Sequence, residues 1–399
     1  MKAFHTVFLC AVCLLLMQPG SALFADEGNS DAQELKVDAE FETGKLYRKG
    51  KFNILELSGS YREMGRQYGA LLKDELNAFY RKAVEEYFIK ERGKTRGRLE
   101  TIARAVYDPY PARYKEIIQG MAETSGLGKN KQILLNAVEW YPKLGHLKYG
   151  GCSAIAAWGP YTSNNSLIIG RNNDDDVLYR DFARFLTVAV FKPGDGGHSA
   201  AVINYAGAVY NPTGMNSQGL FVEMNAGPWM GFSLNRTSIF TTLFSILQDY
   251  ASVSEADPAF RSILPNLSSI ITVADREEAT CYESSLYDTR RADPETKGLV
   301  AATNHFVKPG WNIAWTEEAL SNMSLTRRNN LLALAEKFRG EFNPGVMMDV
   351  LDTTIDHGGA TVDETIYQVV AEPESLTIWL KAPGIQDWTR IPLAQIFGE

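Results

Sequence analysis

The sequence has few of the residues on which several common kinds of protein site depend. Its 399 residues include only four cysteines and five histidines, and 40 Lys and Arg against 48 Asp and Glu give a net charge of −8. So few cysteines exclude a scaffold held together by many disulfides. A mildly acidic chain without long basic runs argues against nucleic acid as a partner. The length allows one large domain or two medium ones, with enough chain to bury a core.

Motifs for metal, nucleotide and serine chemistry are also absent. There is no HExxH, CxxC or calcium-loop spacing, and no P-loop, GxGxxG or GxSxG segment. Asp174, Asp175 and Asp176 are adjacent, and adjacent side chains of a strand point to opposite faces, so all three cannot bind one ion. The four histidines that follow the N-terminal segment show no ligand spacing: His146, His198, His305 and His357. We therefore expect neither a metal nor a cofactor.

The N-terminus has the pattern of a secretory signal peptide. Lys2 is followed by an apolar run from Val7 to Met17, and the small residues Gly20 to Ala22 then offer a cleavage site. The apolar run is too short to span a bilayer comfortably, and no later stretch approaches that length. We expect a signal peptide over residues 1–22, no membrane span, and a protein that is secreted or located in a periplasm or lumen.

Cleavage of this signal would leave two cysteines. Loss of Lys2, Cys10 and Cys13 changes the net charge to −9 and leaves Cys152 and Cys281. Two cysteines so far apart in the chain do not form a disulfide framework. They pair with each other, or at least one is a free thiol with a function.

The mature chain changes character at Gly150–Gly151–Cys152. Before this point, helical spacing covers residues 60–94, a segment after Pro111 and residues 129–139, with Ser60 and Glu63 as a capping box. Residues 26–50 are expected to be an extended lead-in. After this point, alternating apolar runs predict hairpins over 153–171, 184–206, 269–285 and 365–382, a strand over 219–225, and helices over 238–252, 255–266, 326–339 and 344–352. Strands and helices in separate groups predict an α+β fold with antiparallel sheets.

Cys152 follows two glycines, which suggests self-cleavage. Its thiol can attack the carbonyl of Gly151, and glycine offers the least steric resistance to the strained geometry of an N-to-S acyl shift. Hydrolysis of the thioester would make Cys152 a new N-terminus. Its α-amine, with a pKa near 8 in free peptides, then serves as the general base for the thiol.

The surrounding segments resemble the cysteine N-terminal nucleophile (Ntn) hydrolases, which include penicillin acyltransferase-like peptidases, choloylglycine hydrolases and acid ceramidase. The similar segments, in chain order, are Ser60–Gly69, Cys152 with Gly170–Asp174, Gly214–Leu220 with Asn225, Thr303–His305 and Ser324–Arg327. The resemblance implies a four-layer αββα sandwich. It also implies a mainly helical prosegment over residues 23–151 and a catalytic segment over 152–399.

The resemblance also implies roles for single residues. Cys152 is expected to be the nucleophile, and Arg171 to favour its thiolate electrostatically. Asp174 is expected to hydrogen-bond and orient the new α-amine. The alternatives are a structural thiol, a surface salt bridge and a turn residue, respectively.

The resemblance also implies two oxyanion donors and a second arginine at the site. Asn225 and Asn304 are expected to donate amide N–H groups to the developing oxyanion. Arg327 is expected at the site, although the adjacent Arg328 can take the same role. Cys281 lies in an expected strand and is interpreted as a core residue. The aromatic residues that can line an acyl pocket, or simply pack in the core, are Trp158, Phe221, Trp229, Phe232 and Phe240.

The function expected from these residues is hydrolysis of a linear non-peptide amide in a small acyl-amide substrate, such as an N-acyl amide, a bile-salt conjugate or a penicillin. Acyl transfer to an amine is an open alternative. A papain-like protease is another, because Cys152 precedes His305 by a similar spacing, and a non-enzymatic secreted binding module is a third. The prosegment is expected to stay associated after cleavage, because its amphipathic helices need a surface to cover.

Overall fold

The computed structural model describes residues 35–143, 151–233, 235–294, 296–320 and 322–398. The expected signal peptide over residues 1–22 lies outside these ranges. Within them, no helix is both long enough and apolar enough to cross a membrane.

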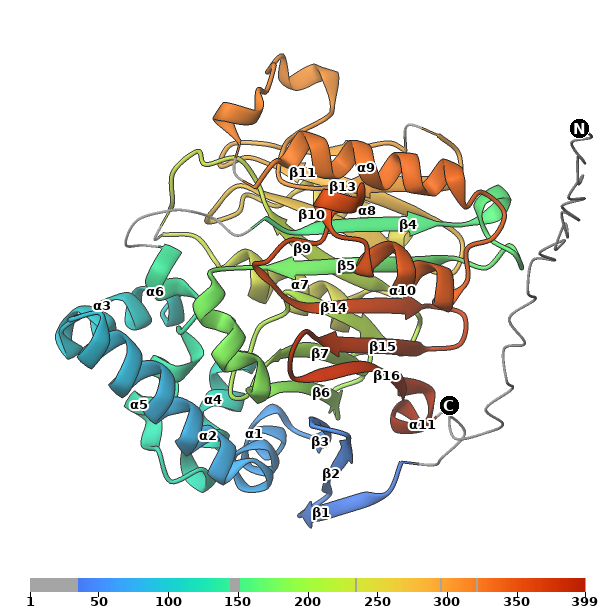
Figure 1. Ribbon diagram of the computed structural model, residues 1–399. Helices are drawn as coiled ribbons and strands as arrows, with labels where there is room; N and C mark the ends of the chain where they lie inside the picture. The colour runs from blue at the N-terminus through green and yellow to red at the C-terminus, as the bar shows by residue number, and fades with distance from the viewer. Residues whose placement is uncertain (1–34, 144–150, 234, 295, 321, 399) are drawn as a thin grey trace, which may run out of the picture. The chain divides into compact units, whose positions relative to one another are not determined.

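A ten-stranded mixed sheet forms one half of the core (Figure 1). All its neighbouring strands are antiparallel except β3 and β6, which pair in parallel from Asn53↔Thr187 to Gly59↔Pro193. In spatial order the strands are β1 (Val37–Phe41), β2 (Gly44–Lys49), β3 (Phe52–Gly59), β6 (Leu186–Pro193), β7 (Ala200–Tyr205), β8 (Thr213–Asn216), β9 (Phe221–Ala226), β10 (Ser269–Ala274), β11 (Ala279–Ser284) and β12 (Thr289–Ala292).

A six-stranded antiparallel sheet forms the other half. Its spatial order is β13 (Leu299–Ala302), β4 (Ser153–Ala157), β5 (Ile168–Asp174), β14 (Thr365–Glu372), β15 (Thr377–Ala382) and β16 (Gln386–Pro392). Every residue of β4 and β5 is buried. A strand buried on both faces needs a layer on each side of its sheet. The expected nucleophile directly precedes β4, and the expected arginine lies on β5.

Helices cover the outer faces of both sheets. On the six-stranded sheet, α9 (Ser324–Lys337) and α10 (Pro344–Asp352) lie across β13, β4, β5 and β14 (Figure 1). On the ten-stranded sheet, α7 (Ile239–Asp249) packs on β7 to β9 and α8 (Val253–Arg261) on β11 and β12. One large core cluster contains residues of both sheets, because their inner faces meet. The expected four-layer αββα sandwich is confirmed.

The residues before Cys152 are mainly helical after β3. They form α1 (Tyr61–Leu71), α2 (Lys73–Phe79), the π-helix η1 (Tyr80–Glu91), α3 (Arg96–Tyr107), α4 (Ala112–Thr124), α5 (Gly128–Asn136) and α6 (Trp140–Lys143). Ser60 and Glu63 form the expected capping box on α1. Helices α1 and α4 are in close contact at two glycines, since a Cβ on Gly65 or on Gly120 would lie 2.1 Å from a carbonyl oxygen of the other helix.

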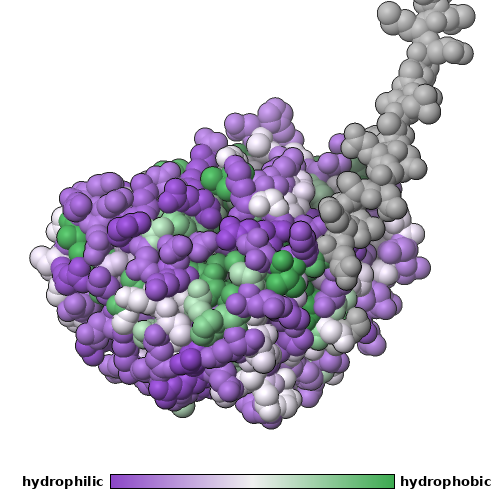
Figure 2. All heavy atoms as spheres, turned by 90° about the horizontal axis from the view of Figure 1, so that it is seen from below, coloured by the Kyte–Doolittle hydropathy of each residue, from purple (hydrophilic) through white to green (hydrophobic). Residues whose placement is uncertain are grey.

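Shorter helices complete the chain. They are the 3₁₀ turns η2 (Gly159–Tyr161), η3 (Val177–Phe185), η4 (Pro309–Trp311), η5 (Glu317–Ala319) and η6 (Ile355–His357), and the C-terminal α11 (Leu393–Phe397). The face seen from below in Figure 1 is largely hydrophilic, with apolar side chains gathered near its middle (Figure 2).

The structure differs from the expectation for residues 26–50. Instead of an extended lead-in, β1 and β2 occupy most of residues 37–49 and, with β3, extend the ten-stranded sheet. The sequence also did not indicate α3 or the short strands β8, β12 and β13. Strands of four residues carry too little alternation to be recognised, and their partners stabilise them only in the folded sheet.

Candidate active site

Cys152 lies at the start of β4, against the C-terminal end of β5. The register of the two strands pairs Ser153 with Asn172, which brings Arg171 and Asp174 beside the thiol. Cys152 Sγ donates to the carbonyl oxygen of Asp174 at 3.6 Å, and Arg171 Nη2 lies 3.8 Å from the same sulfur. Both cysteines that the structure describes, Cys152 and Cys281, are free and buried.

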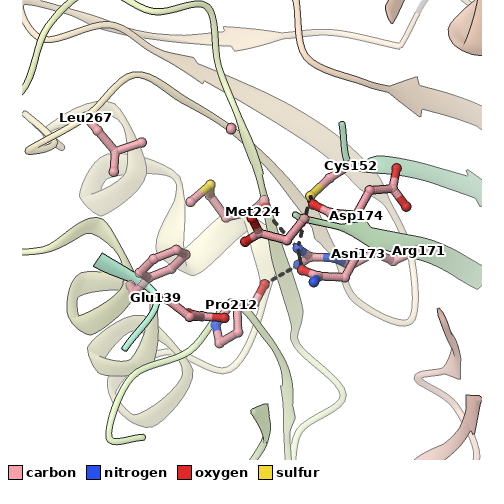
Figure 3. A pocket seen from close by; sticks show the side chains of 11 residues that line it. Glu139, Cys152, Arg171, Asn173, Asp174, Pro212, Met224 and Leu267 are labelled. Atoms are coloured by element: carbon pink, nitrogen blue, oxygen red, sulfur yellow. Dashed lines mark hydrogen bonds between the residues drawn. The ribbon is translucent and has the colours of Figure 1, made fainter. Parts of the chain in front are cut away.

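Arg171 is buried and held by several acceptors (Figure 3). Its Nη1 donates to Pro212 O and to Thr213 Oγ1, while Nη2 donates to Asn173 Oδ1 at 2.7 Å and to Met224 O at 2.9 Å. These bonds fix the guanidinium, so its position beside the thiol does not depend on substrate.

Glu223 provides the counter-charge for Arg171. Its Oε2 lies 3.4 Å from Arg171 Nη1, and both side chains are inaccessible to solvent. Burial raises the pKa of Glu223, although the charge of Arg171 acts in the opposite direction. We did not expect Glu223 from the sequence. The available signal is a charged residue inside an apolar strand, two positions before Asn225 and therefore on the same face.

The pKa of the Cys152 thiol is raised in the uncleaved chain. Burial is the main cause, while the charge of Arg171 acts to lower the pKa. The charge of Arg171 therefore acts in favour of the thiolate, but burial outweighs it here. In this structure Cys152 has an amide nitrogen rather than an α-amine, so the general base expected from the sequence is absent.

Arg327 connects the backbone on both sides of the bond between Gly151 and Cys152 to Asn304. Its Nη1 donates to the carbonyl oxygens of Gly151, at 3.3 Å, and of Cys152, at 3.1 Å. Its Nη2 donates to Asn304 Oδ1 at 2.8 Å. The adjacent Arg328 instead donates from Nε to Ala301 O. The structure thus places Arg327, and not Arg328, at the bond between Gly151 and Cys152.

Gly151 leaves the room that Arg327 occupies. A Cβ on Gly151 would lie 2.5 Å from Arg327 Nη2 and 2.5 Å from Asn322 Cβ. Both distances are far shorter than a normal van der Waals contact. A side chain at position 151 would therefore displace the guanidinium that binds the carbonyl group.

Asp174 is held by two donors. Thr365 Oγ1 donates to its Oδ1 at 2.7 Å, and Arg327 Nη1 lies 3.5 Å from its Oδ2. Burial raises the pKa of Asp174 to about 7, against the lowering effects of Arg327 and Thr365. Its expected partner, the α-amine of Cys152, does not exist in the uncleaved chain. Thr365, which is on β14, was not expected from the sequence.

Asn304 follows β13 and lies against the N-terminal end of α9. Its backbone N–H donates to Ser324 Oγ at 2.9 Å, and its Nδ2 donates to Ala226 O at 2.8 Å. Ser324 Oγ also contacts Thr303 Oγ1 at 2.9 Å and His305 Nδ1 at 2.8 Å. The two expected motifs, Thr303–His305 and Ser324–Arg327, therefore form one hydrogen-bonded unit.

Asn225 is fully buried on β9. Neither atom of its side-chain amide has a hydrogen-bond partner among the residues that the structure describes. Its chain neighbours Met224 and Ala226 accept hydrogen bonds from Arg171 and Asn304, respectively. Asn225 is thus located between two residues of the site, and its role as an oxyanion donor stays a prediction.

A cavity opens beside the thiol (Figure 3). Its volume is about 30 Å³, and its lining includes Cys152, Arg171 and Asp174. Of the five aromatic residues considered for an acyl pocket, only Phe240 lines this cavity. Phe221 packs in the core, and Trp229 is about half exposed. No cluster of three potential metal ligands is found within the described parts of the chain.

The chain has the fold of the cysteine Ntn hydrolases: two stacked sheets, with a cysteine just before a central strand. A family model described as acyl-coenzyme A:6-aminopenicillanic acid acyl-transferase matches residues 161–385. This match covers more than half of the sequence, and the chain belongs to that family.

Two proteins of Dictyostelium discoideum are similar in sequence. Protein dcd1A is 28% identical over 271 residues, which are 58% of this chain and 59% of that protein. Protein dcd1B is 26% identical over 238 residues, which are 53% of this chain and 45% of that protein. The chain thus spans about half the length of these relatives.

Three solved structures are also similar to the chain. A Caenorhabditis elegans N-acylethanolamine-hydrolyzing acid amidase ortholog has a TM-score of 0.44 and 18% identity, over 56% of this chain and 93% of that one. A conjugated bile acid hydrolase from Clostridium perfringens has a TM-score of 0.44 and 12% identity, over 61% of this chain and 93% of that one. A penicillin V acylase from Agrobacterium tumefaciens has a TM-score of 0.43 and 14% identity, over 61% of this chain and 87% of that one.

Proposed function

We propose that the chain is a secreted precursor that cleaves itself between Gly151 and Cys152 and then hydrolyses a linear non-peptide amide. The observation that carries the proposal is the environment of this one peptide bond. The carbonyl oxygen of Gly151 accepts from Arg327, and the thiol of Cys152 lies beside Arg171. Asp174 contacts both this thiol and Arg327. Burying two arginines beside a cysteine is costly and would be unexplained if the cysteine only packed in the core.

Self-cleavage begins with attack of Cys152 Sγ on the carbonyl carbon of Gly151. The S–C bond forms, the thiol proton passes to the nitrogen of Cys152, and the C–N bond breaks to give a thioester. Negative charge develops on the oxygen of Gly151, where Arg327 Nη1 already donates. Water then cleaves the thioester, which leaves a carboxylate on Gly151 and restores the Cys152 thiol with a free α-amine.

The same groups then act on substrate. The α-amine accepts the thiol proton, Sγ attacks the amide carbon, and the oxyanion is stabilised by Asn304 and Asn225. The α-amine returns its proton to the leaving nitrogen. Water completes the cycle by hydrolysing the acyl-enzyme. Arg327 holds Asn304 in place through Oδ1, so the substrate's oxyanion site and the site of self-cleavage share one arginine.

Replacement of the nucleophile tests this proposal. We expect Cys152→Ala to remain one chain without amidase activity, whereas the wild type yields a new N-terminus at Cys152. Intact-mass measurement and N-terminal sequencing distinguish the two results. Cys281→Ala is the matched control, because Cys281 is about equally buried but lies in the apolar core, where Thr272 is its hydrogen-bond partner among the described residues. Wild-type-like activity of Cys152→Ala would contradict the proposal.

Acyl transfer is the second candidate, because the family model that matches the chain is described as an acyl-transferase. A screen of N-acyl amino acids, N-acylethanolamines, ceramide, bile-salt conjugates and penicillins identifies the acyl donor. Repeating the reaction with an added amine shows whether the acyl group passes to water or to the amine. Free acid as the main product at high amine concentration would argue against acyl transfer.

A further inference from the structure

The first residue of β14 reaches the site from a strand that carries none of the site residues expected from the sequence. Strand β14 pairs with β5, and the register places Thr365 directly opposite Asp174. Directly opposed side chains of an antiparallel pair lie on the same face of the sheet. The register then shifts at an irregularity between Thr365 and Tyr367, and a β-bulge of this kind re-aims a side chain. Thr365 is 1% exposed, so its hydroxyl has to bond within the protein.

The proton of the Thr365 hydroxyl is directed at Asp174. Thr365 Oγ1 accepts from the backbone N–H of Val362 at 3.2 Å, and the backbone N–H of Thr365 donates to Val362 O at 3.1 Å. This reciprocal pair fixes the side chain. A hydroxyl has a single O–H donor, and here it donates to Asp174 Oδ1 at 2.7 Å.

The other oxygen of the Asp174 carboxylate faces the backbone of the nucleophile. Arg327 Nη1 lies 3.5 Å from Asp174 Oδ2, and the same nitrogen donates to the carbonyl oxygens of Gly151 and Cys152. The bond from Thr365 is the shorter of the two contacts that hold the carboxylate. It keeps Oδ2 beside Cys152, whose nitrogen becomes the α-amine when the bond to Gly151 is cleaved.

We propose that Thr365 is a positioning residue that holds Asp174 by Oδ1, so that Oδ2 accepts from the α-amine of Cys152 and orients it as the general base. This inference rests on the proposed amidase function. A carboxylate free to rotate would lose the amine, and a misdirected amine accepts the thiol proton less readily. Threonine suits this position because β-branching restricts its rotamer.

The same hydrogen bond acts on the protonation of Asp174. The charged and titratable groups that face Asp174 are Arg327, Arg171, Glu364 and the Cys152 thiol. Burial raises the pKa of Asp174 to about 7, the two arginines and the Thr365 hydroxyl lower it, and Glu364 raises it. Loss of the hydroxyl should therefore raise this pKa further. More of Asp174 would then be neutral near neutral pH, and a neutral carboxyl is a weaker acceptor.

Replacement of Thr365 tests the role without knowledge of the substrate. Iodoacetamide alkylates Cys152 at a rate that depends on its thiolate, and mass spectrometry follows this reaction in the processed enzyme near neutral pH. Thr365→Val keeps the shape of the side chain but loses the hydroxyl, and we expect alkylation to become about tenfold slower. Thr365→Ser keeps the hydroxyl, and we expect a rate within about threefold of the wild type.

Thr361→Val is the matched control. Thr361 also lies close to the start of β14, and its hydroxyl donates to Leu351 O and accepts from Asn172 Nδ2 at 3.0 Å. Its loss should lower the urea midpoint but leave the alkylation rate of Cys152 near that of the wild type. Equal slowing by Thr361→Val and Thr365→Val would assign the effect to general loosening and overturn the proposal.

A second measurement reads Asp174 itself and does not depend on cleavage. In the uncleaved Cys152→Ala chain, isotope-labelled at the aspartate carboxyl groups, loss of a resonance in Asp174→Asn identifies Asp174. NMR titration should give a pKa about one unit higher in Thr365→Val than in the parent, and the parent value in Thr365→Ser. An unchanged pKa in Thr365→Val would overturn the role of the hydroxyl.

The outcomes separate this inference from the proposed function. Wild-type-like alkylation of Thr365→Val, in an enzyme that has a new N-terminus at Cys152, would overturn the positioning role and leave the amidase standing. If Thr365→Val folds but does not cleave itself, the titration of Asp174 decides. A wild-type chain that is never cleaved between Gly151 and Cys152 would contradict the amidase itself.

Discussion

The hydroxyl of Ser324 joins three residues behind the proposed oxyanion site. It accepts from the N–H of Asn304 and contacts Thr303 Oγ1 and His305 Nδ1, all within 2.9 Å. His305 is only 6% exposed. Burial lowers its pKa to about 4, and the charge of Arg328 acts in the same direction. His305 is thus a positioning residue that is neutral near neutral pH.

This pKa predicts a pH-dependent stability. The pKa of His305 is about 4 in the fold against 6.5 for the free side chain, so the unfolded chain binds the extra proton between these values. The free energy of unfolding should therefore fall as the pH drops from 6.5 to 4, by at most about 3 kcal/mol. His305→Asn, which keeps an acceptor near Nδ1, should remove this part of the pH dependence.

The measurement is urea unfolding at several pH values in a Cys152→Ala background, which keeps one uncleaved chain throughout. Arg327 also faces His305 and lowers its pKa, while Glu317 raises it. His357→Asn is the matched control, because His357 lies on the exposed turn η6. Identical pH profiles for His305→Asn and its parent would contradict the prediction.

At the scale of elements, the segment over residues 305–320 connects two residues of the site. It begins directly after Asn304 and leads toward Arg327, and Glu283 of β11 holds it in place. The backbone N–H groups of Val307 and Lys308 and the indole N–H of Trp311 donate to the Glu283 carboxylate. Glu283 is buried, and such a carboxylate is stable only with donors of this kind.

Glu283→Gln should loosen this segment. One carboxylate oxygen becomes an NH₂ group that faces N–H donors, so we expect a loss of about 1–3 kcal/mol in local stability. Hydrogen exchange should become faster at the amides of Val307 and Lys308, and Trp311 fluorescence should shift to the red. Glu278→Gln is the control, because Glu278 makes a partly buried ion pair with Arg291, away from this segment. Unchanged exchange at both amides would contradict the role of Glu283.

At the scale of the whole molecule, the chain before Cys152 shares its core with the chain after it. Strand β3 pairs in parallel with β6 within the ten-stranded sheet. Arg113 of α4 makes two hydrogen bonds of 2.8 Å to Asp249 at the end of α7. Tyr114 stacks on Phe244, with 4.7 Å between the ring centroids. Separation would expose this apolar surface and break a row of backbone hydrogen bonds.

We therefore predict that the two chains stay together after cleavage. The processed protein should elute from size-exclusion columns as one species even at high dilution. In urea, the dissociation of the chains and the loss of secondary structure should share one midpoint. Recovery of folded 152–399 without the N-terminal fragment would contradict this prediction.

Much of the molecule could be predicted from local sequence. The hairpin that carries Cys152 and Arg171, the capping box at Ser60 and most helices of the catalytic segment follow from alternation, helical spacing and turn residues, which act over a few positions. The strands β1, β2 and β8 escaped recognition, because each is stabilised by its partners more than by its own residues.

By itself, the sequence determined an α+β fold with antiparallel sheets, the cysteine at the boundary and the short motifs around it, because these depend on residues close together in the chain. The αββα sandwich was implied by the resemblance of those motifs to the Ntn hydrolases. Only the tertiary structure decided that Arg327 rather than Arg328 reaches the Gly151 carbonyl, that Glu223 pairs with Arg171, and that Glu139 lines the cavity beside the thiol. These contacts join residues of different elements. Their geometry is set by how the sheets and helices pack, which no local pattern encodes.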